Sequence, residues 1–409
     1  MVQAVSIIGG GPAGLRAAEV AASHGAKVTV FEGANSVGRK FLVAGRNGLN
    51  LTNDAEFDRF LSMYVGANIP TELWQSIHRA FDNTALREWA TGLGVDTFVA
   101  GSGKVLPVPV DGKLKATPLL RHWLDRLKAL NVDIRTGHRL IGMDSERQLR
   151  FVHQGDTVRH QSDTVILALG GGSWPKTGSD ASWVSVLSEL GVRMTPLVSS
   201  NCGWEVDWPP ALLEQAEGMP LKNLKLRVGE LQRQGELVIT SYGLEGGPIY
   251  RAGPTLRELS EPHITIDFKP DQTHDELLTR MGNVSRNFVR EARRRLKLDP
   301  GTCALLKYLP NRGPWKTAEQ LVTEVKSCRV DLIRPRPIAE AISTAGGIHW
   351  DELDSNLMLK RIPGVYAIGE MVDWDAPTGG FLLQACFAMG SYVGRACIRD
   401  SDTTGFVSS

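Results

Sequence analysis

The sequence predicts an α/β fold in which a parallel sheet, with a small antiparallel sheet beside it, is split by an inserted domain of mixed β and α structure. The first observation is a unit of strand, glycine-rich turn, helix and strand at the start of the chain. The second is that segments of the same style return in residues 338–409, whereas residues 194–337 hold short alternating strands and then a charged helical stretch. We therefore expect residues 1–193 and 338–409 to form one domain and residues 194–337 a second, substrate-side domain.

The most specific pattern is the glycine-rich turn after the first apolar strand, residues 5–8. Gly9, Gly11 and Gly14 match the spacing G-x-G-x-x-G, and a helix is expected from there to Ser23. Gly9 permits the tight turn, Gly11 lets the backbone approach a pyrophosphate, and Gly14 allows close packing of helix on strand. Such a turn between a strand and a helix is typical of a Rossmann-like dinucleotide-binding unit.

The two ends of this unit indicate the ligand. The helix starts at Pro12 and Ala13, and its N-terminus brings free N–H groups and the positive end of the helix dipole to the phosphates. The second strand, residues 27–31, ends at Glu32, whose carboxylate is placed to accept hydrogen bonds from ribose hydroxyls. A carboxylate at this point would repel a 2′-phosphate, so the ligand is expected to be FAD or NAD rather than NADP.

Composition excludes several classes of protein. The net charge of +1 gives no global attraction to nucleic acid or to a membrane surface. The five cysteines are scattered without C-x-x-C spacing, which argues against a disulfide framework, a zinc site and a dithiol redox pair. No uninterrupted apolar run is long enough to span a membrane, and the first strand begins by Val5, so we expect no signal peptide and a cytoplasmic protein.

Residues 36–53 are rich in glycine, asparagine and basic side chains and are predicted to be a loop. A plain solvated loop is an equal alternative to a ligand-binding one. The candidate ligand contacts in this loop are Arg39 and Lys40 for phosphates, and Asn50, Thr52 and Asn53 for a polar ring edge.

Further elements follow in order along the chain. Two helices are expected between residues 71 and 94, and a third from Thr117 as N-cap, with Pro118 in its first turn, to about residue 130. Strands are expected at residues 95–99, 132–135 and 164–169, the last of which runs into Gly170. Within the inserted domain, strands are expected at residues 224–228, 236–240 and 263–268, and helical structure over residues 275–298.

The C-terminal part repeats the order of strand, acid, glycine and helix. Residues 364–370 read as a strand ending in Gly369 and Glu370, and an apolar helix is expected over residues 381–398. Glu370 is placed to accept a hydrogen bond from a ribityl hydroxyl. The start of the last helix, after Gly379 and Gly380, is placed to stabilise a developing negative charge.

Three pieces together resemble the FAD domain of glutathione-reductase-like flavoproteins, with its two dinucleotide folds: the N-terminal turn with Glu32, the strand of residues 167–171 and the strand of residues 367–370. A second set of motifs resembles, more narrowly, a bacterial family of FAD-dependent oxidoreductases of the aminoacetone-oxidase-like or bile-acid-inducible-reductase-like type. Those motifs are Gly38-Arg39-Lys40, Asn50-Leu51-Thr52-Asn53, Gly369-Glu370-Met371-Val372-Asp373 and Thr378-Gly379-Gly380 with Gln384-Ala385.

The resemblance implies an FAD-dependent oxidoreductase that transfers hydride between the flavin and an activated C=C bond of a small molecule or a nucleobase. Relatives in this family are linked to steroid enones and to a uracil ring of ribosomal RNA, so the resemblance does not name the substrate. The residues implied to hold FAD are Gly9, Gly11, Pro12, Ala13, Gly14, Glu32, Gly38, Arg39, Lys40, Gly170, Gly369 and Glu370, with the isoalloxazine near Asn50, Thr52, Asn53, Thr378, Gly379, Gly380 and Phe381.

Reduction of a double bond also needs a proton donor. The candidates are Tyr242, Glu245 beside it, and His349, and for each of them a structural hydrogen bond is the alternative. No second G-x-G-x-x-G motif occurs, so NAD(P)H is expected to bind only transiently as electron donor. Cys386 is expected to be a small core residue, and no metal site is expected.

A basic stripe within residues 275–298 suggests a second kind of partner. It repeats at helical spacing, opposite apolar residues, which fits contact with RNA phosphates or an ordinary solvated helix. Its members are Arg286, Arg290, Arg293, Arg294 and Lys297. Two rival functions therefore stay open: an RNA-associated flavoprotein that uses FAD mainly as a structural element, and an FAD-dependent amine oxidase.

Overall fold

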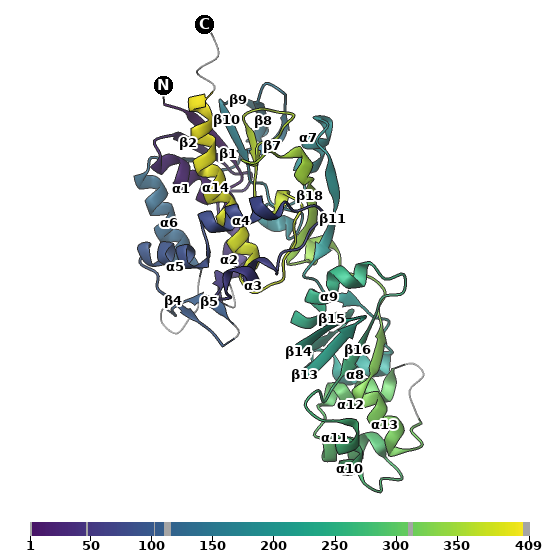
Figure 1. Cartoon of the computed structure of the whole chain (residues 1–409). Coiled ribbons are helices and arrows are strands. Elements are labelled where there is room, and N and C mark those ends of the chain that lie inside the picture. The colour runs from purple at the N-terminus through teal and green to yellow at the C-terminus, as the bar shows by residue number, and fades with distance from the viewer. Residues whose placement is uncertain (1, 46–47, 102, 110–115, 310–313, 404–409) are drawn as a thin grey trace. The chain divides into compact units, whose positions relative to one another are not determined.

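The computed structural model describes residues 2–45, 48–101, 103–109, 116–309 and 314–403, with side chains up to residue 398 (Figure 1). The chain divides into two compact units, residues 1–198 with 343–409 and residues 199–342. The second unit thus begins at residue 199 and ends at 342, whereas the composition suggested 194 and 337. The difference arises because residues 194–200 form strand β11, which pairs with β18 of the first unit.

The first unit is built on a five-stranded sheet in the order β19-β10-β1-β2-β6, in which every pair is parallel. Strand β1 lies in the middle, with β2 and β6 on one side and β10 and β19 on the other. The direction of winding therefore reverses between β1 and β10, and ligands of such sheets bind outside the carboxyl ends of the strands at this point. The bounds are β1 (Ala4–Ile8), β2 (Lys27–Phe31), β6 (Asp133–Arg135), β10 (Thr164–Leu167) and β19 (Val365–Ala367).

Small antiparallel sheets accompany the parallel one, as the sequence predicts. One has the order β3-β5-β4, a second the order β7-β8-β9, and a pair consists of β11 and β18. Their bounds are β3 (Thr52–Asn53), β4 (Thr97–Val99), β5 (Lys104–Pro107), β7 (Arg139–Met143), β8 (Gln148–His153), β9 (Asp156–Gln161), β11 (Met194–Ser200) and β18 (Ser343–Ile348).

Helices surround these sheets. Three predictions about elements of this unit were wrong: one about a loop, one about a helix cap and one about the end of a strand. The loop expected at residues 36–53 contains helix α2, because Gly38 in the left-handed region (φ +68°) turns the chain into it. Thr117 is the first residue of α6, not its cap, and no side chain caps that helix. The strand expected up to residue 370 ends at β19, after which Gly369–Met371 form a 3₁₀ turn. The helices of this unit are α1 (Pro12–Ser23), α2 (Arg39–Ala44), α3 (Phe57–Leu61), α4 (Thr71–Ala80), α5 (Asn83–Gly92), α6 (Thr117–Ala129), α7 (Trp183–Glu189) and α14 (Phe381–Thr403), with 3₁₀ turns η1 (Pro175–Thr177), η3 (Trp350–Glu352) and η4 (Gly369–Met371).

Helix α14 (yellow in Figure 1) lies beside α1 (purple) at very short range. A Cβ atom on Gly390 would lie 2.5 Å from the carbonyl oxygen of Ala13, and one on Gly394 would lie 2.8 Å from Cβ of Val20. The window of residues 381–398 has a mean hydropathy of 1.3, apolar and long enough to cross a membrane, but 67% of it is buried inside the structure. Such burial is usual for the core helix of a globular protein.

The second unit is a six-stranded antiparallel sheet, in the order β12-β15-β14-β13-β16-β17, with its own hydrophobic core. The helical stretch expected at residues 275–298 is two helices, because Gly282 and Asn287 adopt positive φ (56° and 53°). Two of the expected strands are longer than predicted. The bounds are β12 (Trp204–Glu205), α8 (Pro210–Ala216), β13 (Pro220–Val228), β14 (Leu231–Thr240), β15 (Gly243–Glu245), α9 (Gly247–Arg257), β16 (His263–Asp267), α10 (His274–Met281), α11 (Phe288–Leu296), α12 (Pro300–Tyr308), α13 (Ala318–Lys326), β17 (Cys328–Asp331) and η2 (Ile338–Glu340).

A buried carboxylate ties α1 to its neighbouring helices. Glu19 is 6% exposed and accepts hydrogen bonds from Arg16 at 2.9 Å and from Arg126 at 3.1 Å. The indole N–H groups of Trp89 and Trp123 donate to the same carboxylate at 3.0 Å and 2.9 Å. Because a buried charge is tolerated only when it is paired and hydrogen-bonded, these contacts fix α1 against α5 and α6.

We expect Glu19→Ala to lower the free energy of unfolding of the first unit by about 3–5 kcal/mol, since it leaves the Arg16 guanidinium buried without a counterion. Urea unfolding followed by tryptophan fluorescence measures this change, because Trp89 and Trp123 lie at the site. The matched control is Glu88→Ala, which removes an exposed carboxylate from α5 and is expected to change little. Equal stability of the two variants would contradict the role given to Glu19.

Candidate functional site

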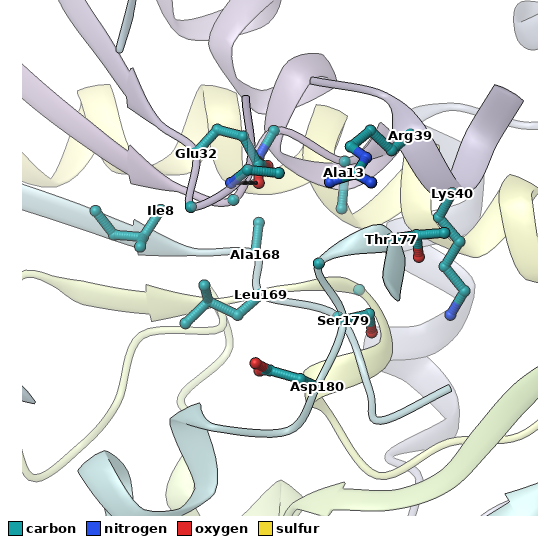
Figure 2. A pocket seen from close by; sticks show the side chains of 18 of the residues that line it. Ile8, Ala13, Glu32, Arg39, Lys40, Ala168, Leu169, Thr177, Ser179 and Asp180 are labelled. Carbon is teal, nitrogen blue, oxygen red and sulfur yellow. Dashed lines mark hydrogen bonds between the residues drawn. The ribbon is translucent and has the colours of Figure 1, made fainter. Parts of the chain in front are cut away.

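A cavity of about 320 Å³ opens at the carboxyl ends of the parallel strands of the first unit (Figure 2). Its wall includes Ile8 and Phe31, the last residues of β1 and β2, and Ala168 and Ile368, the residues that follow β10 and β19. The cavity therefore lies at the reversal point of the sheet, where this class of fold binds nucleotides. Its volume is at the lower end of the range of roughly 300–1,000 Å³ found for ligand pockets.

The glycine turn forms one side of this cavity. Gly9 has φ +111°, and a Cβ atom on it would lie 2.2 Å from the carbonyl oxygen of Ala168. A Cβ atom on Gly14 would lie 2.0 Å from the carbonyl oxygen of Gly9, so helix and strand can pack this closely only without a side chain. Gly11 has no protein atom within 4 Å of its Cβ position, and no side chain caps α1. The start of α1 thus leaves open space and unused N–H groups for an anion, which fits a bound pyrophosphate.

Glu32 directly follows β2, and two backbone N–H groups hold its carboxylate in place. Its Oε2 accepts a hydrogen bond from the Gly10 N–H at 2.9 Å, and its Oε1 accepts one from the Ala34 N–H at 2.7 Å. Each carboxylate oxygen keeps a further lone pair for a ligand, since an ionised carboxylate accepts about four hydrogen bonds. The arrangement fits a ribose with two neighbouring hydroxyls.

Lys40 and Glu370, both expected to contact the ligand, contact each other. Lys40 Nζ lies 2.9 Å from Glu370 Oε2 and also donates to Ser173 Oγ at 2.6 Å. Both residues line the cavity, as do Gly38, Gly170 and Gly369. The Lys40 ammonium is therefore neutralised by a carboxylate here.

Cys386 also lines the cavity, from α14. Burial, and then the neighbouring Glu370 carboxylate, raise the pKa of its thiol to about 12. A thiol with such a pKa stays protonated at neutral pH and is a poor nucleophile. The side chain is packed against the hydrophobic core, as expected, while part of it faces the ligand cavity.

The loop after β10 closes another side of the cavity, and the sequence analysis missed it. Arg39 Nη2 donates to the carbonyl oxygen of Lys176 at 2.9 Å, and Arg139 Nη2 lies 2.8 Å from Asp180 Oδ2. Between these anchors, Gly178 has φ +105°. The signal was the density of glycines directly after a buried strand, of which the sequence analysis assigned only Gly170 to the cofactor. The other lining residues that were missed include Phe31, Ser36, His138, Leu140, Thr177, Ser179, Ser182 and Trp183.

A further group of candidate residues does not line this cavity within the described part of the chain. It lies where β3 meets the start of α14: a Cβ atom on Gly380 would lie 2.3 Å from the carbonyl of Thr52. Asn53 Nδ2 donates to the carbonyl oxygen of Gly379 at 3.2 Å, and with its amide turned to satisfy both groups, Asn50 bridges Thr52 O and Gly380 N. Thr378 and Phe381 flank this group, and the hydroxyl of Thr52 is buried without a hydrogen-bond partner among the residues that the structure describes.

Tyr242 lies in the turn between β14 and β15 of the second unit. Its hydroxyl donates a hydrogen bond to the Glu245 carboxylate, and the guanidinium of Arg336 lies 4.2 Å from the centre of its ring. Burial, followed by the hydrogen bond to Glu245, raises the pKa of the Tyr242 phenol well above its usual range. His349, in the first unit, accepts a hydrogen bond from the Asp351 N–H at 3.3 Å and so caps η3. It does not line the cavity, within the described residues.

The basic stripe falls on and around α11. Phe288, Ala292 and Leu296 form its buried face. The five predicted cations are exposed, with Arg286 ahead of the helix and Lys297 just after it. Arg294 is paired with Glu291 at 2.8 Å, whereas Arg290 and Arg293 have no carboxylate partner in the described part of the chain.

The family model described as HI0933-like protein Rossmann domain matches residues 3–396. A 3-dehydro-bile acid delta(4,6)-reductase of Clostridium scindens is 28% identical over 412 residues, which covers 96% of this chain and 98% of that protein. A ribosomal RNA dihydrouridine synthase of Haemophilus influenzae is 22% identical over 92% of this chain and 94% of that protein. Among solved structures, the open conformation of a flavocytochrome c3 fumarate reductase has a TM-score of 0.53 at 13% identity, over 97% of this chain and 78% of that one, which shows a similar fold.

Two substitutions in the glycine turn separate folding from binding. Gly14→Ala is expected to destabilise the first unit, because its Cβ atom would overlap the Gly9 carbonyl. Gly11→Ala meets no protein atom, so the melting temperature should stay close to that of the natural chain while flavin content falls about tenfold or more. Thermal unfolding and the visible absorbance of the purified protein measure the two effects. Full flavin content in Gly11→Ala would exclude this turn as the pyrophosphate site.

Proposed function

We propose that this protein, which belongs to the HI0933-like family of Rossmann-domain proteins, holds FAD in the cavity of its first unit and reduces an activated C=C bond. The protein is an FAD-dependent oxidoreductase. One observation carries the proposal. The open glycine turn and Glu32, whose carboxylate is held by two backbone N–H groups, both lie where the winding of the parallel sheet reverses. Gly11 and the start of α1 would hold the pyrophosphate, and Glu32 a ribose.

The proposed substrate class is a small molecule whose C=C bond is conjugated to a carbonyl. The bile-acid reductase of Clostridium scindens supports this class, because it matches nearly the whole chain. When bound, the flavin supplies hydride transfer. The double bond gains this hydride at one carbon and a proton at the other, so the chain must hold a proton donor. NADH or NADPH is the proposed electron source, bound only transiently.

Tyr242 is our candidate for the proton donor. The phenol is protonated at neutral pH, as a general acid must be. The Glu245 carboxylate accepts a hydrogen bond from the hydroxyl and so orients it, while Arg336 lies over one face of the ring. After the transfer the phenolate would take its proton back from water. His349 stays a second candidate, but its contacts with Asp351 and Asn68 already give it a structural role.

Anaerobic stopped-flow spectroscopy tests the function directly. The flavin is reduced with NADH or NADPH, and its reoxidation is followed with conjugated enones, including steroid enones, and with simple alkenes as control. Rapid reoxidation by enones alone is expected. Rapid aerobic turnover of amines with hydrogen peroxide would favour the amine oxidase instead, and a protein purified without any flavin would refute both.

We expect Tyr242→Phe to slow substrate reduction about 100-fold or more, since a positioned general acid contributes on the order of 10²–10⁴ in rate. Reduction of the flavin by NAD(P)H should be unchanged, because that step needs no proton from Tyr242. Tyr308→Phe, in the same unit, is the matched control and should behave as the natural chain. Equal losses in both half-reactions would point to a structural role for Tyr242.

RNA is a second candidate substrate or partner, and one observation favours it. Arg290 and Arg293 are exposed on one helix without carboxylate partners within the described residues, which suits contact with phosphates. The relative from Haemophilus influenzae, named for synthesis of dihydrouridine in ribosomal RNA, supports the same reading. A uracil ring also contains a C=C bond conjugated to a carbonyl, so both candidates require the same chemistry.

Charge reversal tests this second candidate. The double variant Arg290→Glu and Arg293→Glu should weaken ribosomal RNA binding and lower the slope of log K against log salt by about 2, one for each lost phosphate contact. Lys222→Glu, exposed on β13 of the same unit, is the control for charge alone. Equally weak binding of ribosomal RNA by the natural chain, the double variant and Lys222→Glu would leave the small molecule as the substrate.

The fold is that of a soluble α/β enzyme, and we propose the cytoplasm as its compartment. The five cysteines are scattered along the sequence without C-x-x-C spacing, which suits a reducing environment.

A further inference from the structure

Ser179 carries a polar atom that nothing in the fold explains. The residue is 7% exposed, and its Oγ is buried without a hydrogen-bond partner in the described part of the chain. Most buried hydroxyls are hydrogen-bonded, and a specific exception calls for a reason. Ser179 lines the cavity of the first unit, where it is drawn among the side chains of Figure 2. The unused hydroxyl is therefore at the surface of a ligand site.

The position of Ser179 relates it to two acidic residues that line the cavity, Glu370 and Glu32. The Cβ position of Gly170 lies 2.9 Å from Ser179 Oγ and 4.0 Å from Glu370 Oε2. On the other side, the Cβ position of the neighbouring Gly178 lies 3.5 Å from Glu32 Oε1. Both glycines have positive φ, so the backbone of this wall lies close to the two carboxylates without a side chain between. Ser179 follows Gly178 directly, and its hydroxyl lies against Gly170.

The loop that carries Ser179 is held in place without a ligand. Arg39 binds the carbonyl of Lys176 ahead of it, and Arg139 binds Asp180 directly after it. Trp183 Nε1 donates to the carbonyl oxygen of Gly170 at 2.8 Å, which joins the loop to the start of α7. The hydroxyl is thus preorganised in one place, which lowers the entropy cost of binding.

We propose that Ser179 is a cofactor-binding residue whose hydroxyl hydrogen-bonds the sugar–phosphate part of the ADP half of the dinucleotide. The inference rests on the proposed function, in which this cavity holds FAD. The ADP half is assigned because the loop lies against Glu32, the ribose acceptor, and faces the glycine turn that receives the phosphates. A hydroxyl suits this position because it donates to a phosphate oxygen or ribose oxygen and accepts from a ribose hydroxyl.

The test is titration calorimetry on protein freed of flavin, with FAD, ADP and riboflavin as separate probes. Ser179→Ala should raise the Kd for FAD and for ADP by about tenfold each, the effect of one lost hydrogen bond to a charged group, and leave riboflavin unchanged. The melting temperature of the flavin-free variant should stay the same or rise, because an unpaired buried hydroxyl has been removed. A lowered melting temperature with an unchanged Kd for ADP would make Ser179 structural and overturn the proposal.

Two further variants keep the outcomes distinct. Ser185→Ala, an exposed serine on α7 outside the cavity, is the matched control and should bind all probes normally. Ser179→Cys, close in size but a weak hydrogen-bond donor, should show the same loss as alanine and replaces it if the alanine variant does not fold. If the natural chain binds neither FAD nor ADP, the proposed function fails. If Gly11→Ala abolishes binding while both Ser179 variants bind normally, only the present inference fails.

Discussion

Helix α1 lies in backbone contact with two neighbours, and the site depends on this close approach. On one side, Gly14 faces the carbonyl oxygen of Gly9 at a distance that excludes any side chain. On the other, Gly390 of α14 faces the carbonyl oxygen of Ala13 in the same way. The buried carboxylate of Glu19 restrains the helix further along its length. Held on these sides, the start of α1 keeps its unpaired N–H groups at the crevice between β1 and β10, where an anion is stabilised by the helix dipole.

The charges around the cavity follow from the same arrangement. Lys40 is paired with Glu370, Arg139 with Asp180, and Arg39 with a backbone carbonyl. Lys40 and Arg139 thus each have a carboxylate counterion. Arg39, bonded to a neutral carbonyl, keeps its charge at the cavity wall and adds to the positive potential of the helix terminus. A phosphate close to Lys40 would compete with Glu370 for its ammonium group.

In the second unit, Tyr242 and Arg336 belong to one network of side-chain contacts. The Tyr242 hydroxyl donates to Glu245, and Arg336 lies over the Tyr242 ring. Arg336 is further paired with Glu205 at 2.9 Å and Glu340 at 2.7 Å. All of these residues lie in the unit of residues 199–342. Because the cavity proposed to hold the cofactor is lined by residues of the first unit, variants of this network should leave cofactor binding intact. Loss of a proton-transfer step and loss of flavin can thus be told apart.

Sequence alone determined the glycine turn and Glu32, because a strand, a turn and a helix that follow one another are set by local spacing. It placed both Lys40 and Glu370 at the ligand but not against each other, since their contact joins residues 330 positions apart. Nor did it find the loop that carries Ser179, which meets Glu32 only after β10 pairs with β1. Local pattern shows which residues can contact a cofactor, whereas the pairing of distant strands decides which of them surround one cavity and which are already bound to each other.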